Sequence, residues 1–169
     1  VRLGGDFGRL TWCTWGGAMG AEFLSSVGVS AQVIGAPAAP TSAKDTQLAV
    51  KALGATHIDL LLFVGGDGTA RDVLAAIDEL TFTCVLGLPA GVKMHSGVFA
   101  ISPTAAADVV AGLAQGSLVG RILREVRDYA PAVPGASNSR HQTVATKRYG
   151  ELWVPEAAGY LQQMKVGGK

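Results

Sequence analysis

The sequence predicts an α/β fold in which a parallel sheet is flanked by helices. The main observation is the apolar run of residues 60–64, which leads directly into the glycine-rich turn of residues 65–69. After this turn the apolar residues recur at helical spacing, and a second apolar run follows at residues 82–88. Apolar runs bounded by glycines are typical of strands buried on both faces of a parallel sheet. A strand, a helix and a second strand in this order form a right-handed crossover unit.

The elements that precede this unit are shorter. Residues 11–15 predict a short strand that leads into a loop with two glycine pairs, which either touch a ligand or only shape the loop. Residues 21–27 predict a helix, because its apolar residues share one face, and Gly28 follows as the residue that ends it. Residues 29–34 alternate between apolar and other residues, which indicates a strand.

A second helix is predicted over residues 43–53. Ser42 precedes it as the N-cap, and Asp45 lies three residues later, close to a capping box. A single apolar stripe runs along this helix, through Ala43, Leu48, Ala49, Ala52 and Leu53. Thr41, Ser42 and Asp45 also carry groups that could reach a ligand, but helix capping is the favoured interpretation.

The central strand is predicted over residues 58–64 and its helix over about 69–79. The next strand covers residues 82–88, and a further helix begins at Pro103 after Ser102. From residue 120 charged residues mix with apolar ones. This second part of the chain is expected to contain a strand at 121–128, a linker at 130–141 and a strand at 143–155.

The composition limits the classes of protein to which the chain can belong. Its 169 residues are enough for a domain with a sizeable core, and its net charge of +1 gives no broad electrostatic case for nucleic acid or membrane. No apolar stretch approaches the ~20 residues of a membrane span. Cys13 and Cys84 lack metal-ligand spacing, which favours two reduced thiols in a cytoplasmic protein.

Two domains are expected. Residues 1–120 are predicted to form an α/β nucleotide-binding domain, and residues 121–169 a linker with the start of a truncated β-rich domain. The chain begins without Met, and Gly167-Gly168-Lys169 ends it before a second domain could close. We therefore expect a fragment of a longer protein, although the sequence does not settle whether this chain alone is active.

The turn of residues 65–69 is the first candidate site. A turn between a strand and a helix leaves backbone N–H groups unpaired where the helix dipole favours anions, so phosphate is the expected ligand. Glycines remove the Cβ atoms that would block a phosphate, and the predicted phosphate-binding residues here are Gly65, Gly66, Gly68 and Thr69. Asp67 would repel phosphate unless it acts as a general base or holds Mg²⁺. The turn matches neither the dinucleotide fingerprint nor the P-loop.

A second set of polar residues follows the next strand. The carboxyl ends of parallel strands meet at one edge of a sheet, so the loop after residue 88 should lie beside the turn that contains Asp67. This placement brings Lys93, His95 and Ser96 near Asp67. Lys93 would neutralise phosphate, His95 would bond phosphate or ribose, and Ser96 would donate to a ligand oxygen. Arg71 either reaches a phosphate or lies on a solvated helix face.

Gly65-Gly66-Asp67-Gly68-Thr69 resembles the signature shared by NAD kinases, diacylglycerol kinases, sphingosine kinases and, with Ser in place of Thr, 6-phosphofructokinases. The block of residues 87–100, together with the segments 17–20 and 41–46, is similar to the ATP-NAD kinase-like branch that includes acetoin-catabolism protein X. The resemblance implies a Rossmann-like parallel sheet with flanking helices, followed by a β-rich second domain. Asn138 is followed by Ser139, where NAD kinases have an Asn-Glu pair.

The resemblance implies transfer of the ATP γ-phosphoryl group to the 2′-hydroxyl of NAD, with Mg²⁺, for NADP biosynthesis. In NAD kinases the equivalent of Asp67 is credited with activating this hydroxyl. The alternatives are a kinase for another small alcohol or a lipid, and a non-catalytic nucleotide-binding relative. Nucleotides are the expected partners, with no nucleic acid and no membrane, and a homo-oligomer is possible. The phosphate donor, ATP or polyphosphate, and the true acceptor stay open.

Overall fold

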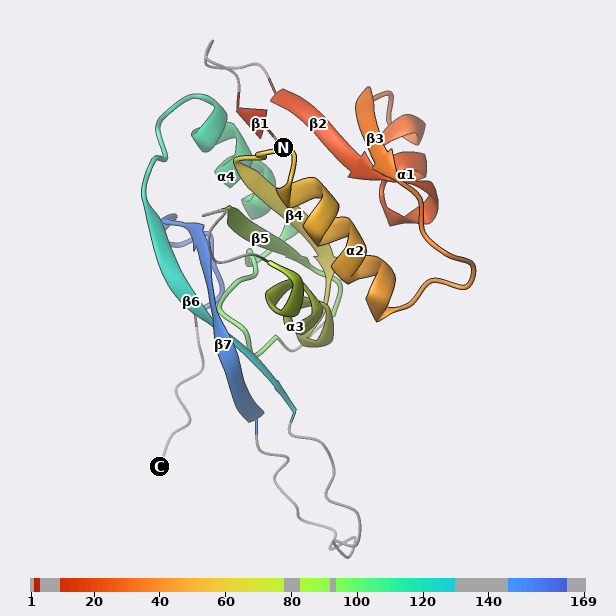
Figure 1. Cartoon of the computed structure of the whole chain (residues 1–169). Helices are drawn as coiled ribbons and strands as arrows, with labels where there is room; N and C mark the ends of the chain where they lie inside the picture. The colour runs from red at the N-terminus through yellow and green to blue at the C-terminus, as the bar shows by residue number, and fades with distance from the viewer. Residues whose placement is uncertain (1, 4–9, 78–82, 92–93, 130–145, 164–169) are drawn as a thin grey trace, which may run out of the picture.

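The computed structural model describes residues 2–3, 10–77, 83–91, 94–129 and 146–163 (Figure 1). The predicted linker at 130–141 and the end of the chain from residue 164 lie outside these residues. The predicted site residue Lys93 lies outside them as well.

The described residues form a mixed α/β fold, as predicted. The strands are β1 (Arg2–Leu3), β2 (Leu10–Trp15), β3 (Ala31–Gly35), β4 (Leu60–Gly65), β5 (Cys84–Pro89), β6 (Arg121–Tyr129) and β7 (Thr146–Pro155). The helices are the short 3₁₀ helix η1 (Gly17–Met19) and the α-helices α1 (Ala21–Ser26), α2 (Ala43–Gly54), α3 (Asp67–Ala76) and α4 (Pro103–Ala114).

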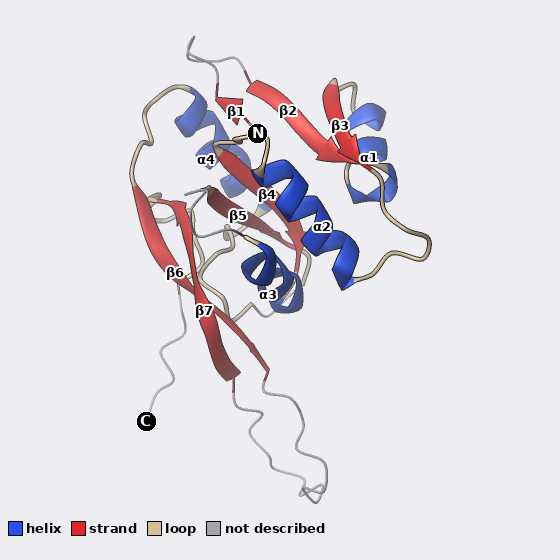
Figure 2. Ribbon diagram, in the orientation of Figure 1, coloured by secondary structure: helices blue, strands red, loops and turns tan. Residues whose placement is uncertain are grey.

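The predicted parallel pairing of the two strands on either side of α3 is confirmed, and the described strands β2 and β3 are parallel as well. Strand β2 pairs with β3 in parallel, and β4 pairs with β5 in parallel from Leu60–Cys84 to Gly65–Pro89. Strand β1 is antiparallel to β2, and β6 and β7 form an antiparallel pair. Helices α2 and α3 lie on one side of the β4–β5 pair and α4 on the other (Figures 1 and 2).

The core lies around the β4–β5 pair and is closed by residues 98–100. The amide of Gly87 donates to the carbonyl of Val98, and the amide of Ala100 donates to the carbonyl of Gly87, each at 2.9 Å. Phe99 is fully buried and meets the ring of Phe63 edge to face, with 5.4 Å between ring centroids. A Cβ on Gly87 would collide with both rings, so glycine is required there. This return of the chain fixes the loop that precedes it, which contains His95 and Ser96.

The β6–β7 pair packs into the same core as β4 and β5. Val126 and Val154 are fully buried, and Leu152 is nearly so; all three belong to the core cluster. Gly150 lies directly against the side chain of Leu74 on α3. The carboxyl-terminal part of the described chain therefore forms a wall against α3. Within the described residues, no helix is long and apolar enough to cross a membrane.

Helix α2 begins with the capping arrangement that the sequence predicts. Asp45 is 4% exposed, and its carboxylate accepts hydrogen bonds from the amide of Ser42 at 2.8 Å, the hydroxyl of Ser42 at 2.9 Å and the amide of Ala38 at 2.7 Å. These contacts tie the preceding loop to the helix. The amide of Ala38, followed by the two groups of Ser42, lowers the pKa of Asp45 below its ordinary value of 3.8.

The stability of the fold should fall in acid because of Asp45. A carboxyl whose folded pKa is lowered stabilises the fold above its unfolded pKa, and this contribution is lost as the pH falls through the folded pKa. Asp45→Asn should lower the Tm at pH 7 and lose less stability than the wild type below about pH 4. Thermal unfolding followed by circular dichroism from pH 7 to pH 3 measures both effects. Parallel pH profiles for the two proteins would contradict this assignment.

Candidate active site

Asp67 is the first residue of α3, and Gly66 alone separates it from the carboxyl end of β4. The prediction that this helix begins at Thr69 is therefore wrong by two residues, because Asp67 and Gly68 form its first turn. The side chain is 8% exposed. One carboxylate oxygen accepts from the amide of His95 at 2.8 Å, and the other accepts from the amide of Ser96 at 3.0 Å. The sheet edge therefore brings His95 and Ser96 to Asp67, as the sequence predicts.

The structure gives different reasons for glycine at the three glycine positions of the turn. A Cβ on Gly65 would collide with the side chain of Thr69, so glycine is needed there for packing. Gly66, the N-cap of α3, has a φ of −116°, and no atom of the described residues lies within 4 Å of an added Cβ. At Gly68 the described atom nearest to an added Cβ is one oxygen of Asp128, at 4.0 Å. Neither a positive φ nor packing against the described residues requires glycine at 66 or 68, so the described part of the chain leaves the space above them open.

The start of α3 also carries backbone donors. The first N–H groups of an α-helix have no acceptor within the helix. Among the described residues, no acceptor is found for the amides of Asp67, Gly68 and Thr69, whereas the next amide, of Ala70, bonds the carbonyl of Gly66. Together with the open space over the glycines, these amides make a surface that favours an anion.

Ser96 holds the loop in place. Its hydroxyl donates to the carbonyl of Arg127 at 2.8 Å and accepts from the amide of Arg127 at 2.9 Å, and the residue is 1% exposed. The next amide, of Gly97, donates to the carbonyl of Glu125 at 2.9 Å. A hydroxyl has one proton, so none is left for a ligand. This corrects the expectation that Ser96 donates to a ligand oxygen: Ser96 connects β6 to the two amides that hold Asp67.

His95 is half-buried and faces β6 with its ring. Its Nε2 lies 3.3 Å from the hydroxyl of Tyr129, and the two rings meet edge to face with 5.2 Å between centroids. Tyr129 is 47% exposed. The ring of His95 therefore has one nitrogen engaged with Tyr129, while its backbone amide holds Asp67.

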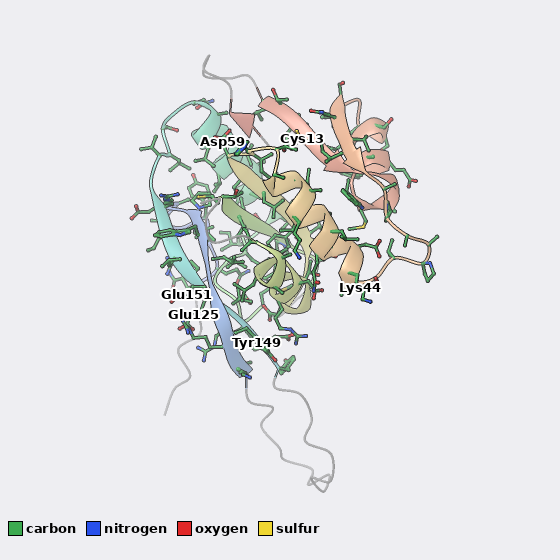
Figure 3. All side chains as sticks on the ribbon, viewed as in Figure 1. Cys13, Lys44, Asp59, Glu125, Tyr149 and Glu151 are labelled. Atoms are coloured by element: carbon green, nitrogen blue, oxygen red, sulfur yellow. The ribbon has the colours of Figure 1, made fainter. Side chains whose placement is uncertain are left out.

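Arg71 lies one turn after Asp67 and is paired rather than free. Its guanidinium bonds the carboxylate of Asp128 at 3.0 Å and lies 4.8 Å from the ring centroid of Tyr149. Tyr149 lies beside α3, whereas Glu125 and Glu151 lie together farther along the hairpin (Figure 3). Sequence reasoning missed Asp128, Tyr129 and Tyr149 as parts of this site.

Asp72 adds a second carboxyl group next to Arg71. Burial raises the pKa of Asp72 above its ordinary value of 3.8, and the charge of Asp128 adds to this effect. The charge of Arg71 and a hydrogen bond from Gln47 oppose it. The charges of Arg71 and Asp128 both act on Asp72, but it is Asp128 that Arg71 contacts.

The described residues contain no cluster of three or more His, Cys, Asp or Glu side chains that could hold a metal ion. Mg²⁺ in kinase sites commonly binds one or two carboxylates and completes its shell with phosphate and water oxygens. A carboxylate offers about four lone-pair positions, and two of those of Asp67 are used by amides. Asp67 therefore fits as one Mg²⁺ ligand in a shell supplied mostly by phosphates.

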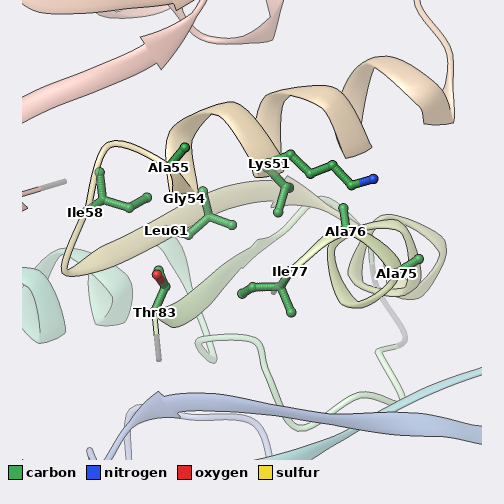
Figure 4. Close-up of a pocket in the computed structure, with 10 residues that line it drawn as sticks. Lys51, Gly54, Ala55, Ile58, Leu61, Ala75, Ala76, Ile77 and Thr83 are labelled. Carbon is green, nitrogen blue, oxygen red and sulfur yellow. The ribbon is translucent and has the colours of Figure 1, made fainter. Parts of the chain in front are cut away.

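A separate groove lies at the other end of the strands (Figure 4). It has a volume of about 450 Å³ and lies between α2, the end of α3 and the residues that precede β4 and β5. Its lining is mostly apolar and includes Ile58, Leu61, Ala76 and Ile77. Because Ile58 and Thr83 precede their strands, this groove is remote from Asp67 and contains none of the predicted site residues.

Comparison with known proteins gives one result of significance. A family model, the ATP-NAD kinase N-terminal domain, matches residues 13–118, which is more than half of the chain. The matched region contains the turn of Asp67 and the loop of His95 and Ser96, and it ends before β6. No curated protein and no solved structure matches the chain significantly. The chain therefore belongs to the ATP-NAD kinase N-terminal domain family, which supports a kinase-like nucleotide-binding role.

Proposed function

We propose that this chain binds ATP and NAD and takes part in transfer of the ATP γ-phosphoryl group to the 2′-hydroxyl of NAD, which gives NADP. The family match supports the reaction class. The observation that carries the proposal is the open space over Gly66 and Gly68 at the start of α3, directly beside the buried carboxylate of Asp67.

The chain supplies two of the requirements of phosphoryl transfer, which depends mainly on positioning and on neutralising charge. The amides of residues 67–69 and the dipole of α3 would hold phosphate oxygens. Asp67 keeps lone pairs free beyond its two amide bonds. It would accept the proton of the acceptor hydroxyl as that oxygen attacks. Mg²⁺, held mainly by the phosphates, would neutralise phosphate charge. In the alternative role of Asp67, its carboxylate would bind this ion instead of acting as the base.

The contacts of Asp67 fix the orientation of its carboxylate, as the role of a general base requires. Two amides fix both carboxylate oxygens, and Ser96 anchors those amides to β6. A carboxylate held on both sides cannot rotate away from the acceptor. A base held in the productive direction typically contributes about 10²–10⁴ to a rate.

Incubation of the full chain with ATP, Mg²⁺ and NAD, followed by separation of the nucleotides, tests the proposal. NADP should form, and its formation should require both ATP and Mg²⁺. If ADP is released only when another alcohol replaces NAD, NAD is not the acceptor and the protein is a kinase of that alcohol. Stabilisation by ATP with no ADP released would favour a non-catalytic relative. Polyphosphate in place of ATP identifies the donor.

A further inference from the structure

We propose that Arg71 is a phosphate-binding residue of this site, and that Asp128 occupies the position of the ligand's negative charge until a phosphoryl group replaces it. This inference rests on the proposed phosphate site at the start of α3. It adds Arg71 and Asp128, which contact each other although they are 57 residues apart in the sequence. Asp128 lies outside the region that the family model matches.

Arg71 is placed to reach a phosphate at the start of α3. Residues four apart lie on the same face of a helix, so Arg71 shares the face of Asp67. Long side chains on a helix lean toward its N-terminus and cover the preceding turn. The preceding turn here contains Gly68, above which the space is open except for Asp128.

Asp128 stands where a phosphate would be favoured. One of its oxygens lies 3.0 Å from the guanidinium of Arg71 and 4.0 Å from the position of a Cβ on Gly68. Negative charge near the first turn of a helix is stabilised by the dipole. A single carboxylate therefore pairs with Arg71 and lies near the start of the helix, and these are the two features that would attract phosphate.

A phosphoryl group could readily replace Asp128 as the partner of Arg71. The side chain of Arg71 is 41% exposed and that of Asp128 is 17% exposed, so solvent reaches the pair through the guanidinium and weakens it. A guanidinium has five N–H donors and binds phosphate through two of them at once. The ring of Tyr149, 4.8 Å away, holds the guanidinium in place while its partner changes. A phosphoryl group offers more charge and more acceptor oxygens than Asp128 does.

Asp128 should therefore weaken phosphate binding, and its removal should strengthen it. We would measure binding of inorganic tripolyphosphate to the full chain by calorimetry, at low salt and without Mg²⁺. Asp128→Asn should bind about two- to fivefold more tightly than the wild type, which is the range expected for removing one partner of a partly exposed ion pair. Arg71→Gln should bind roughly tenfold or more weakly, because charge-assisted hydrogen bonds are lost.

Glu151→Gln is the matched control. Glu151 pairs with Arg148 at 3.1 Å on the same hairpin but away from the start of α3 (Figure 3). This variant removes the same charge and should leave tripolyphosphate binding unchanged. Arg71→Lys keeps the charge but loses the paired donors, so its affinity should fall between those of the wild type and Arg71→Gln. It serves as the test if Arg71→Gln fails to fold.

Three outcomes would overturn the inference. The first is equal or weaker tripolyphosphate binding by Asp128→Asn, and the second is no binding by either the wild type or Asp128→Asn. The third is a loss of ATP affinity in Asp128→Asn only when Mg²⁺ is present, which would make Asp128 a metal ligand instead. Tripolyphosphate binding in the expected order, without any NADP formed from NAD, would support the inference and overturn the proposed acceptor.

Discussion

Asp67→Asn is expected to lower the rate of phosphoryl transfer by about 10²–10⁴, the range for loss of a positioned base. It should also destabilise the fold. Both carboxylate oxygens accept backbone amides, from His95 and Ser96. An asparagine has one oxygen and one NH₂ group in place of two oxygens. The backbone N–H of either His95 or Ser96 would therefore face the NH₂ group, which is also a donor. Leaving a buried polar group unpaired costs about 1–3 kcal/mol.

The two effects of Asp67→Asn are separated by measuring turnover at saturating substrate and unfolding by urea on the same samples. Asp108→Asn is the control, because Asp108 is an exposed acidic residue on α4. It should change neither quantity. Near-normal turnover by a folded Asp67→Asn protein would remove Asp67 from the chemistry. Unchanged stability would contradict the two amide bonds.

The second large effect is a contrast between two glycines three residues apart. Gly65→Ala should destabilise the fold by about 1–3 kcal/mol, because the new Cβ would collide with the side chain of Thr69 and force it to move. Gly68→Ala should fold at least as well as the wild type, and alanine in place of a helical glycine contributes about 0.5–1 kcal/mol. Its Cβ would nevertheless fill the open space over the start of α3.

The effects of these two glycine substitutions on nucleotide binding should be the reverse of their effects on stability, with the larger loss in Gly68→Ala. Gly68→Ala should weaken ATP binding by about tenfold or more, the cost of losing a hydrogen bond from an amide to a charged phosphate. Urea unfolding and calorimetric titration with ATP measure the two properties independently. A stable Gly68→Ala protein with wild-type ATP affinity would show that no ligand occupies the space over this glycine.

The strand, turn and helix around Asp67 could be predicted because their signal is local. An apolar run, a glycine-rich turn and helical spacing are contiguous in the sequence. The approach of His95 and Ser96 to Asp67 could also be predicted, because the carboxyl ends of adjacent parallel strands share one edge of a sheet. The sequence predicts a start of α3 two residues later than the structure shows, because glycine is a poor helix former and hides the helical state of Gly68.

The β6 side of the site could not be predicted from the sequence. Arg71 and Asp128 are 57 residues apart, and the charged alternation of β6 gives no sign that it packs against α3. The role of Ser96 could not be predicted either, for a related reason. A serine after a strand end carries the same signal whether its hydroxyl meets a ligand or, as here, the backbone of Arg127. Contacts of this kind depend on tertiary packing rather than on local pattern.

The central claim is that nucleotide phosphates bind at the start of α3 beside Asp67. An amide-resolved NMR titration of the full chain with ATP and Mg²⁺ tests it most directly, because it needs no turnover. The largest shifts should fall on the amides of Gly66, Asp67, Gly68 and Thr69, with smaller ones at His95 and Ser96. Shifts confined to the groove between α2 and the end of α3, or no shifts at any ATP concentration, would contradict the claim.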